Sequence, residues 1–238
     1  AGEMSGRYWR YRAGGPRAAE EKGPGSLDLK GKFERIKAIR VPDYLPNGAK
    51  SREYIEFAVR DGEVASADFV LKGAIYDFPY HQGKGGEFRM QARVKDVDFH
   101  YLDGWPNVND INGEIVFHNT GLEAKLDSAR IFNAPLKQTV VAVDDFAGVP
   151  PLLSIQGRVD ARAEDVARFL KESPMIDGVG AFTRFVALDG PGKLELGMKF
   201  SLAPSENGVK EPPRINGKYT LLRAHAIALG ERGIDISN

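Results

Sequence analysis

The sequence of 238 residues contains no cysteine, carries no net charge and has no long apolar segment. The absence of cysteine excludes a disulfide scaffold, a cysteine nucleophile and a thiolate metal site. The 33 basic residues are balanced by 33 acidic ones, which argues against a nucleic-acid-binding domain because such domains carry a basic excess. No window approaches the roughly 20 apolar residues that a membrane-spanning helix needs. The remaining composition, 42% hydrophobic and 28% charged, is that of a globular protein.

The two ends of the chain indicate a piece of a longer protein. The sequence starts Ala1-Gly2-Glu3 without an initiator methionine or signal peptide, and it stops at Asn238 within an apparent strand. Residues 13–26 are rich in glycine, proline and charge and have no periodicity, which is typical of a linker. We therefore expect residues 1–26 to be a strand remnant with a flexible linker, and any membrane anchor to lie outside the chain.

Alternation of apolar and polar residues dominates the rest of the sequence. From Glu87 to Lys95 every second residue is apolar, and residues 122–126 and 194–202 repeat the pattern. This is the period of a half-buried strand, and sheets with one wet and one dry face are normally antiparallel. The pattern predicts a mainly β fold in which the charge lies on one side of the sheet.

Helical spacing is limited to three short segments. The first, Arg52–Asp61, would be capped by Ser51 and stopped by Gly62. The second, Ala163–Glu172, ends before Ser173-Pro174. A weaker third segment spans residues 175–186. We therefore expect residues 27–238 to form one repeated β region with helical insertions near 51–62 and 163–186.

A five-residue pattern, Leu or Ile, any residue, Gly, any residue, apolar, occurs five times. Its glycines are 42, 40, 44 and 60 residues apart, and the longest interval holds the second and third helices. Recurrence on this scale suggests stacked units of a few strands each, in which glycine permits a bulge or bend. The alternative is that a short glycine pattern recurs by chance. The copies are Leu29–Phe33, Leu71–Ile75, Ile111–Ile115, Ile155–Val159 and Ile215–Tyr219.

No motif of an enzyme is present, so we expect no catalytic residue, metal or cofactor. The sequence lacks the serine elbow, the dinucleotide fingerprint and the phosphate loop. A calcium-loop interpretation of Asn107–Gly113 fails because Val108 and Asn119 would occupy positions that require acidic residues. A polar turn leading into the strand at Gly113 is the better interpretation. The four histidines have no metal-site spacing.

The most distinctive short stretch is Tyr101-Leu-Asp-Gly-Trp105-Pro106. An exposed tryptophan next to tyrosine is compatible with a platform on which sugars stack, and hence with a carbohydrate-binding module. The other interpretation is a rigid turn whose indole packs over the end of the core. We favour the turn.

Taken in order along the chain, short motifs resemble the YhdP-like branch of the AsmA-like family of Gram-negative envelope proteins. The resemblance covers roughly residues 27–238. One departure is Leu202-Ala-Pro204, where Pro-Leu is expected. The motifs are Tyr44-Leu-Pro46, Gly62-Glu-Val, Leu71-Lys-Gly73, Asp77-Phe-Pro79, Gly86-Glu-Phe88, Tyr101, Trp105-Pro106, Gly113, Phe117 and Ser173-Pro174.

The resemblance implies an elongated, curled antiparallel sheet whose repeated β units form a taco-like groove with an apolar floor. It also implies a segment of an inner-membrane-anchored periplasmic protein that carries phospholipid acyl chains between the inner and outer membranes. Its partners would be acyl chains, neighbouring repeats of the same chain and proteins at either membrane, but not nucleic acid. The alternative is a structural or interaction β-scaffold of the cell envelope that binds no lipid.

Combined with the alternation, this implied groove gives a list of expected lipid-groove residues, each of which has a closed core under the helices as its alternative location. They are Phe88, Met90, Ala92, Val94, Ile115, Phe117, Leu122, Ala124, Leu126, Leu194, Leu196, Met198 and Phe200.

Overall fold

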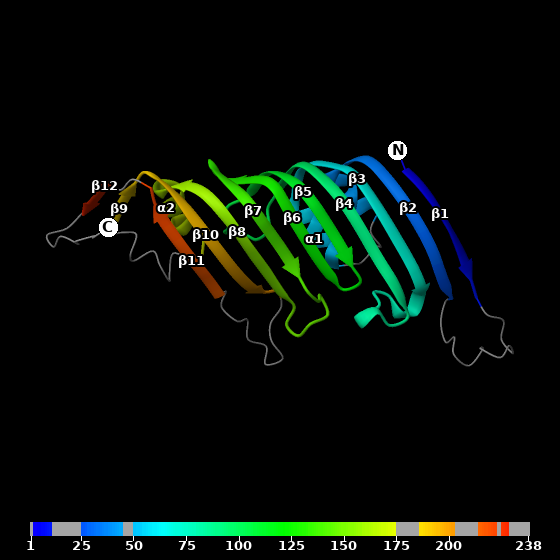
Figure 1. Cartoon of the computed structure of the whole chain (residues 1–238). Helices are drawn as coiled ribbons and strands as arrows, with labels where there is room; N and C mark the ends of the chain where they lie inside the picture. The colour runs from blue at the N-terminus through cyan, green and yellow to red at the C-terminus, as the bar shows by residue number, and fades with distance from the viewer. Residues whose placement is uncertain are drawn as a thin grey trace.

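The computed structural model describes residues 2–10, 25–44, 50–174, 186–202, 214–222 and 225–228. Its main element is a ten-stranded sheet in the order β1-β2-β3-β4-β5-β6-β7-β8-β10-β11, with every pair antiparallel. The expected mainly β, antiparallel, curled architecture is confirmed. Figure 1 shows the sheet as a curved, unclosed band with α1 and α2 behind it.

The strands of the large sheet are β1 (Gly2–Trp9), β2 (Ser26–Lys37), β3 (Val59–Ala74), β4 (Gly86–Phe99), β5 (Val108–His118), β6 (Gly121–Ile131), β7 (Ala134–Val143), β8 (Leu152–Arg162), β10 (Pro191–Ser201) and β11 (Arg214–Leu221). A separate two-stranded sheet pairs β9 (Val186–Asp189) with β12 (His225–Ala228). The helical elements are η1 (Ala38–Tyr44), α1 (Lys50–Ala58), η2 (Ile75–Asp77), η3 (His81–Gly83) and α2 (Ala163–Glu172).

The consecutive order of the strands places their connections on two opposite edges of the sheet. We call one the helix edge, because it carries η1, α1, α2 and the β4–β5 connection (residues 100–107). We call the other the turn edge, because it carries the connections β3–β4, β5–β6 and β7–β8 and the end of β10. In Figure 1 the turn edge is the lower border of the sheet.

The second helix has the expected bounds. Glu164 and Asp165 lie in its first turn and Lys171 in its last, which places charges favourably at both ends of the helix dipole. Val166 packs against the buried cluster of Ala134, Val159 and Ala161. The sequence signals for this helix are local, and they were sufficient.

The first helix differs from the prediction at both ends. It runs from Lys50 to Ala58, so Ser51 lies inside it and residues 59–61 belong to β3. Gly62 is also in β3, with φ +114°, and a Cβ there would lie 2.5 Å from Cα of Val97. The glycine is therefore required by a close approach of two strands and does not end the helix.

Three further expectations concern segment bounds. Ser26 is the first residue of β2, so the linker is shorter than residues 13–26, most of which lie outside the described residues. Val186 begins β9 and is not helical, while the rest of the third expected helix, residues 175–185, is also outside them. The stretch from Val108 to Gly113 is strand β5 from its first residue and is no turn.

The five glycines of the recurring pattern lie on β2, β3, β5, β8 and β11. Successive copies are one, two, three and two strands apart in the sheet, so what recurs is a position within one strand, with no constant number of strands between copies. The register places all five glycines on the face that carries Met90. Backbone or side-chain atoms lie within 3.0 Å of the position of an added Cβ at four of them, Gly31, Gly73, Gly113 and Gly157.

Candidate functional site

One face of the large sheet is apolar from β1 to β11. Directly opposed residues of antiparallel strands share a face, and the register therefore groups the side chains without ambiguity. Met90 is opposite Phe69 on one side and Phe117 on the other, and Met198 is opposite Ile155 and Ile215. Across the ten described strands, the register assigns no Asp, Glu, Lys or Arg to this face between its bulges and the turn edge.

All thirteen residues expected to line a groove lie on this apolar face. Ala92, Val94, Ala124 and Met198 are buried, and the other nine are half-buried. The apolar face also includes residues that the sequence analysis missed, because their strands alternate less strictly or are interrupted by glycine. Examples are Leu29, Phe69, Val141 and Ile155. The signal available for them was the recurring pattern itself, whose first or last residue most of them are or adjoin.

Burial on this face is unusual for its size. Sixteen hydrophobic residues are buried in the described part of the chain, of which nine are alanine and five are valine. No leucine, isoleucine, phenylalanine or tryptophan among the described residues belongs to this buried group, although these types are usually among the most buried in globular proteins. The larger apolar side chains are thus covered on one side only.

The opposite face of the sheet carries the charge. Lys32 is 3.5 Å from Asp68, and Arg93 is 2.7 Å from Asp127. Further pairs link β7 to β8 and β8 to β10. Exposed ion pairs of this kind contribute little stability, about 0 to 1 kcal/mol each. Their consequence is a balanced, hydrated outer face, which explains how the equal numbers of acidic and basic residues coexist with an uncharged inner face.

The helix edge folds back over part of the apolar face. Ala38 of η1 packs against Val64, Ala67 and Ala92. Tyr54 of α1 contacts Phe99 at a ring distance of 6.3 Å. Together with Val166 of α2, these contacts cover the helix-edge half of the face and leave the half nearer the turn edge without a covering helix.

The β4–β5 connection crosses the apolar face. Trp105 contacts Tyr101 of the same connection at 5.9 Å, Phe169 of α2 at 6.0 Å and Phe200 at 5.6 Å, measured between ring centroids. Phe200 is opposite Leu153, near the turn edge, so the indole joins a helix-edge loop to the far side of the sheet. Pro106 is buried, and Gly113 follows in β5.

The contacts of Trp105 decide between the two interpretations of this stretch. The indole is half-buried against three aromatic rings, so it is no flat exposed platform for a sugar. The hydroxyl of Tyr54 donates a hydrogen bond to the backbone oxygen of Tyr101 at 3.2 Å. Burial, and to a lesser degree the neighbouring Tyr54, raises the pKa of the Tyr101 phenol above its ordinary value. The stretch is a packed connection.

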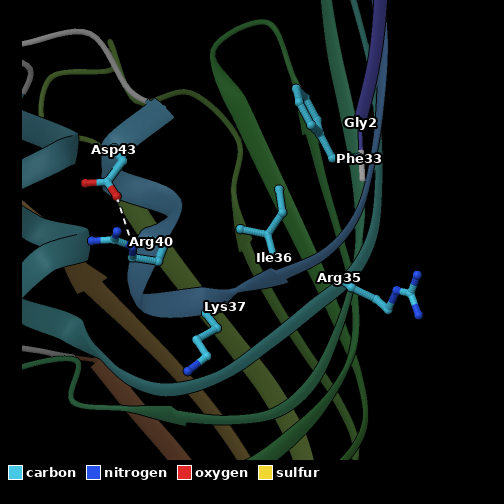
Figure 2. Close-up of a pocket in the computed structure, with 7 residues that line it drawn as sticks. All are labelled: Gly2, Phe33, Arg35, Ile36, Lys37, Arg40 and Asp43. Atoms are coloured by element: carbon cyan, nitrogen blue, oxygen red, sulfur yellow. Dashed lines mark ion pairs between the residues drawn. The ribbon is translucent and has the colours of Figure 1, made fainter.

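A pocket of about 440 Å³ lies where β2 passes into η1. Figure 2 shows Phe33 and Ile36 pointing to one side of the strand and Arg35 to the other. Arg40 pairs with Asp43 at 3.3 Å, which neutralises much of the local charge. The pocket is therefore the end of the apolar face, with Lys37 as its nearest unpaired cation among the lining residues.

Polar clusters outside the apolar face make no metal site in the described part of the chain. His100 follows β4 at the helix edge, whereas His118 ends β5 at the turn edge, so these histidines do not meet. The carboxylate of Asp98 accepts hydrogen bonds from Asn109 at 2.9 Å and from the backbone of Asp110 at 3.2 Å. The polar residues of this segment serve the β4–β5 pairing. Among the described helices, none is long and apolar enough to cross a membrane.

Comparison with known proteins agrees with this architecture. The family model described as YhdP protein matches residues 10–238. A curated relative, the intermembrane phospholipid transporter YhdP of Escherichia coli (strain K12), is 23% identical over 150 residues. That alignment covers 62% of this chain and 12% of the relative, so the chain spans about an eighth of the relative's length. No solved structure matches.

Proposed function

The chain belongs to the YhdP family, and from this membership we propose that its apolar face carries the acyl chains of phospholipid. The observation that supports the proposal best is the uncharged face of ten strands whose large side chains are only half covered. A closed core would bury such residues. A lipid-binding groove leaves them partly accessible, since the acyl chain completes the burial.

The energetics of such a face suit transport. Burying one methylene contributes about 0.8 kcal/mol, so covering about ten methylenes contributes on the order of 8 kcal/mol before the cost of ordering the chain is subtracted. Apolar contacts are non-directional, and a lipid can therefore slide from one strand to the next without breaking specific bonds. The absence of charge also means that the head group stays outside the face.

In the finer form of this proposal, the chain is one segment of a periplasmic bridge that is anchored in the inner membrane by a part outside residues 1–238. Phospholipid would pass along the groove between the inner and outer membranes. Neighbouring repeats of the same chain would extend the groove, and proteins at either membrane would be its further partners. Support comes from the family and from the name of the relative, an intermembrane phospholipid transporter.

Two experiments test lipid binding directly. Mass spectrometry of solvent extracts from the purified chain should detect phospholipid. A photoreactive residue at Met90, on the apolar face, should crosslink lipid in cells, whereas the same residue at Arg89, next to it and on the charged face, should not. Equal crosslinking at the two positions, or a lipid-free protein, would sink the proposal.

The alternative is a structural or interaction β-scaffold of the cell envelope without lipid binding. It is favoured by β1, which pairs with β2 alone and is exposed at all eight positions. An open edge of this kind can add a strand from another segment. A chain that associates through β1 and yields no lipid in extracts would support the scaffold.

A further inference from the structure

Exposed large apolar side chains gather along the turn edge. Four of them lie in connections between strands, and the fifth follows β10. We call this set the apolar rim: Tyr76 (76% exposed), Phe78 (50%), Phe146 (46%), Val149 (68%) and Leu202 (45%). Isolated exposed apolar residues need no explanation, but a row of them along one border does.

Backbone hydrogen bonds join the connections that carry the rim into one continuous border. The amide of Phe146 donates to the oxygen of Thr120 at 2.7 Å, linking the β7–β8 and β5–β6 connections. The amide of Leu202 donates to the oxygen of Pro151 at 2.9 Å. The exposed side chains are thus held in place by ordered backbone.

The β3–β4 connection is anchored from below. Tyr80 is completely buried, and its ring lies against Gly86, where an added Cβ would come within 2.6 Å of it. Phe78 contacts Tyr80 at 5.8 Å while remaining half exposed itself. One aromatic residue of the connection therefore fixes it, and its neighbour is held out at the border.

The rim is continuous with the apolar face. Phe78 also contacts Phe88 at a ring distance of 5.5 Å, and Phe88 is opposite Leu71 on that face. The opposite border is different, because there η1, α1, α2 and the β4–β5 connection pack onto the face. A lipid crossing the helix edge must displace these contacts, whereas the turn edge presents apolar side chains without a cover.

From this asymmetry, and resting on the proposed function, we propose that the acyl chains of a phospholipid enter and leave the groove sideways over the apolar rim. The barrier to such transfer is the exposure of methylenes to water while they pass from a bilayer to the groove. Apolar side chains at the border cover part of that surface during passage. The rim therefore controls the rate of loading, and the floor of the groove controls the amount bound.

The test compares two double variants of the whole chain. Tyr76→Ser with Val149→Ser removes the two most exposed rim residues, and Ile39→Ser with Leu102→Ser removes exposed apolar residues at the helix edge as a matched control. Each protein is mixed with vesicles of phosphatidylethanolamine and phosphatidylglycerol that contain a pyrene-labelled phospholipid, and uptake is followed by fluorescence. Urea unfolding verifies that both variants are folded.

We expect the rim variant to load at least about threefold more slowly, with an unchanged amount of lipid bound at the end, because only the passage is impaired. The control variant should load at the rate of the unmodified chain. Equal rates for the two variants, or a loss of bound lipid without a change in rate, would overturn the rim as the entry border while leaving lipid binding intact. An unmodified chain that takes up no lipid would instead remove the proposed function and this inference with it.

Discussion

Gly113 and Gly217 occupy the same position of the recurring pattern but have different surroundings. A Cβ added at Gly113 would lie 2.3 Å from the backbone oxygen of Lys125 and 3.0 Å from Cα of Leu126. A Cβ added at Gly217 would meet nothing closer than 3.6 Å, a methyl of Leu196. The two positions therefore separate the effect of glycine on strand curvature from its general effect on chain entropy.

The magnitudes follow from these distances. Alanine in place of glycine stabilises a strand by about 0.5 to 1 kcal/mol where space allows, and this is the expected result for Gly217→Ala. At Gly113 the obstacle is the backbone of the next strand, which moves only if the β5–β6 pairing opens. Overpacking of this kind costs about 1 to 3 kcal/mol, so we expect Gly113→Ala to be destabilising by about 1 to 2 kcal/mol.

Urea unfolding followed by circular dichroism gives both values from the shift of the midpoint. Gly113→Ala should lower the midpoint and Gly217→Ala should raise it slightly, with similar slopes. Shifts of the same sign and size at the two glycines would refute the argument that the apolar face is too tightly curved at β5 to accept a side chain.

Three further predictions concern single side chains. Arg35 is exposed with φ +55°, so Arg35→Gly should raise the free energy of unfolding by about 0.5 to 1 kcal/mol, whereas Arg35→Ala should leave it unchanged in the same urea titration. Trp105→Ala should destabilise by about 2 kcal/mol, because it removes three ring contacts, while Leu102→Ala in the same connection should have little effect; equal losses would contradict the packing role of the indole. Because the raised pKa of Tyr101 means that the folded state holds the phenolic proton more tightly, stability should fall as the pH rises above the ordinary value of 10.0. Tyr101→Phe should lose less stability than the unmodified chain between about pH 8 and about pH 11, and parallel losses would show that Tyr101 does not carry this sensitivity.

Local signals in the sequence predicted the elements that depend on local chemistry. The bounds of α2 followed from its acidic first turn and from Ser173-Pro174. The strict alternation in residues 87–95 placed β4 and assigned its faces correctly. For the candidate site, all thirteen residues share one face for the same reason, since alternation is a property of each strand by itself.

The features that were predicted wrongly depend on contacts between distant strands. Gly62 was interpreted as a helix stop, but the requirement for glycine comes from Val97 in the neighbouring strand. The polar run before Gly113 suggested a turn, yet its side chains are used by the β4–β5 pairing, as Asn109 and Asp98 show. The contact of Trp105 with Phe200 joins residues 95 positions apart in the chain, and no local pattern contains it.

One signal for the curvature is present in the sequence but is not visible as simple alternation. On six neighbouring strands the residues that share the apolar face are at one point three positions apart in place of two, and the register gives these steps as 33/36, 64/67, 94/97, 108/111, 126/129 and 136/139. Each step adds one residue to a strand, which increases its local twist and bends it, and Arg35, Asp96, Asp110 and Gln138 occupy four of the steps with positive φ.

Because the steps lie on adjacent strands, the bends add up to a fold line across the sheet. An extra residue would otherwise turn the rest of each strand inside out, but here the sequence shifts its apolar positions by the same one residue. The strand therefore bends while its inner side remains apolar on both sides of the line. The curvature of the sheet and the continuity of its apolar face thus have a common origin in the spacing of the sequence, and that combination is what a groove for acyl chains requires.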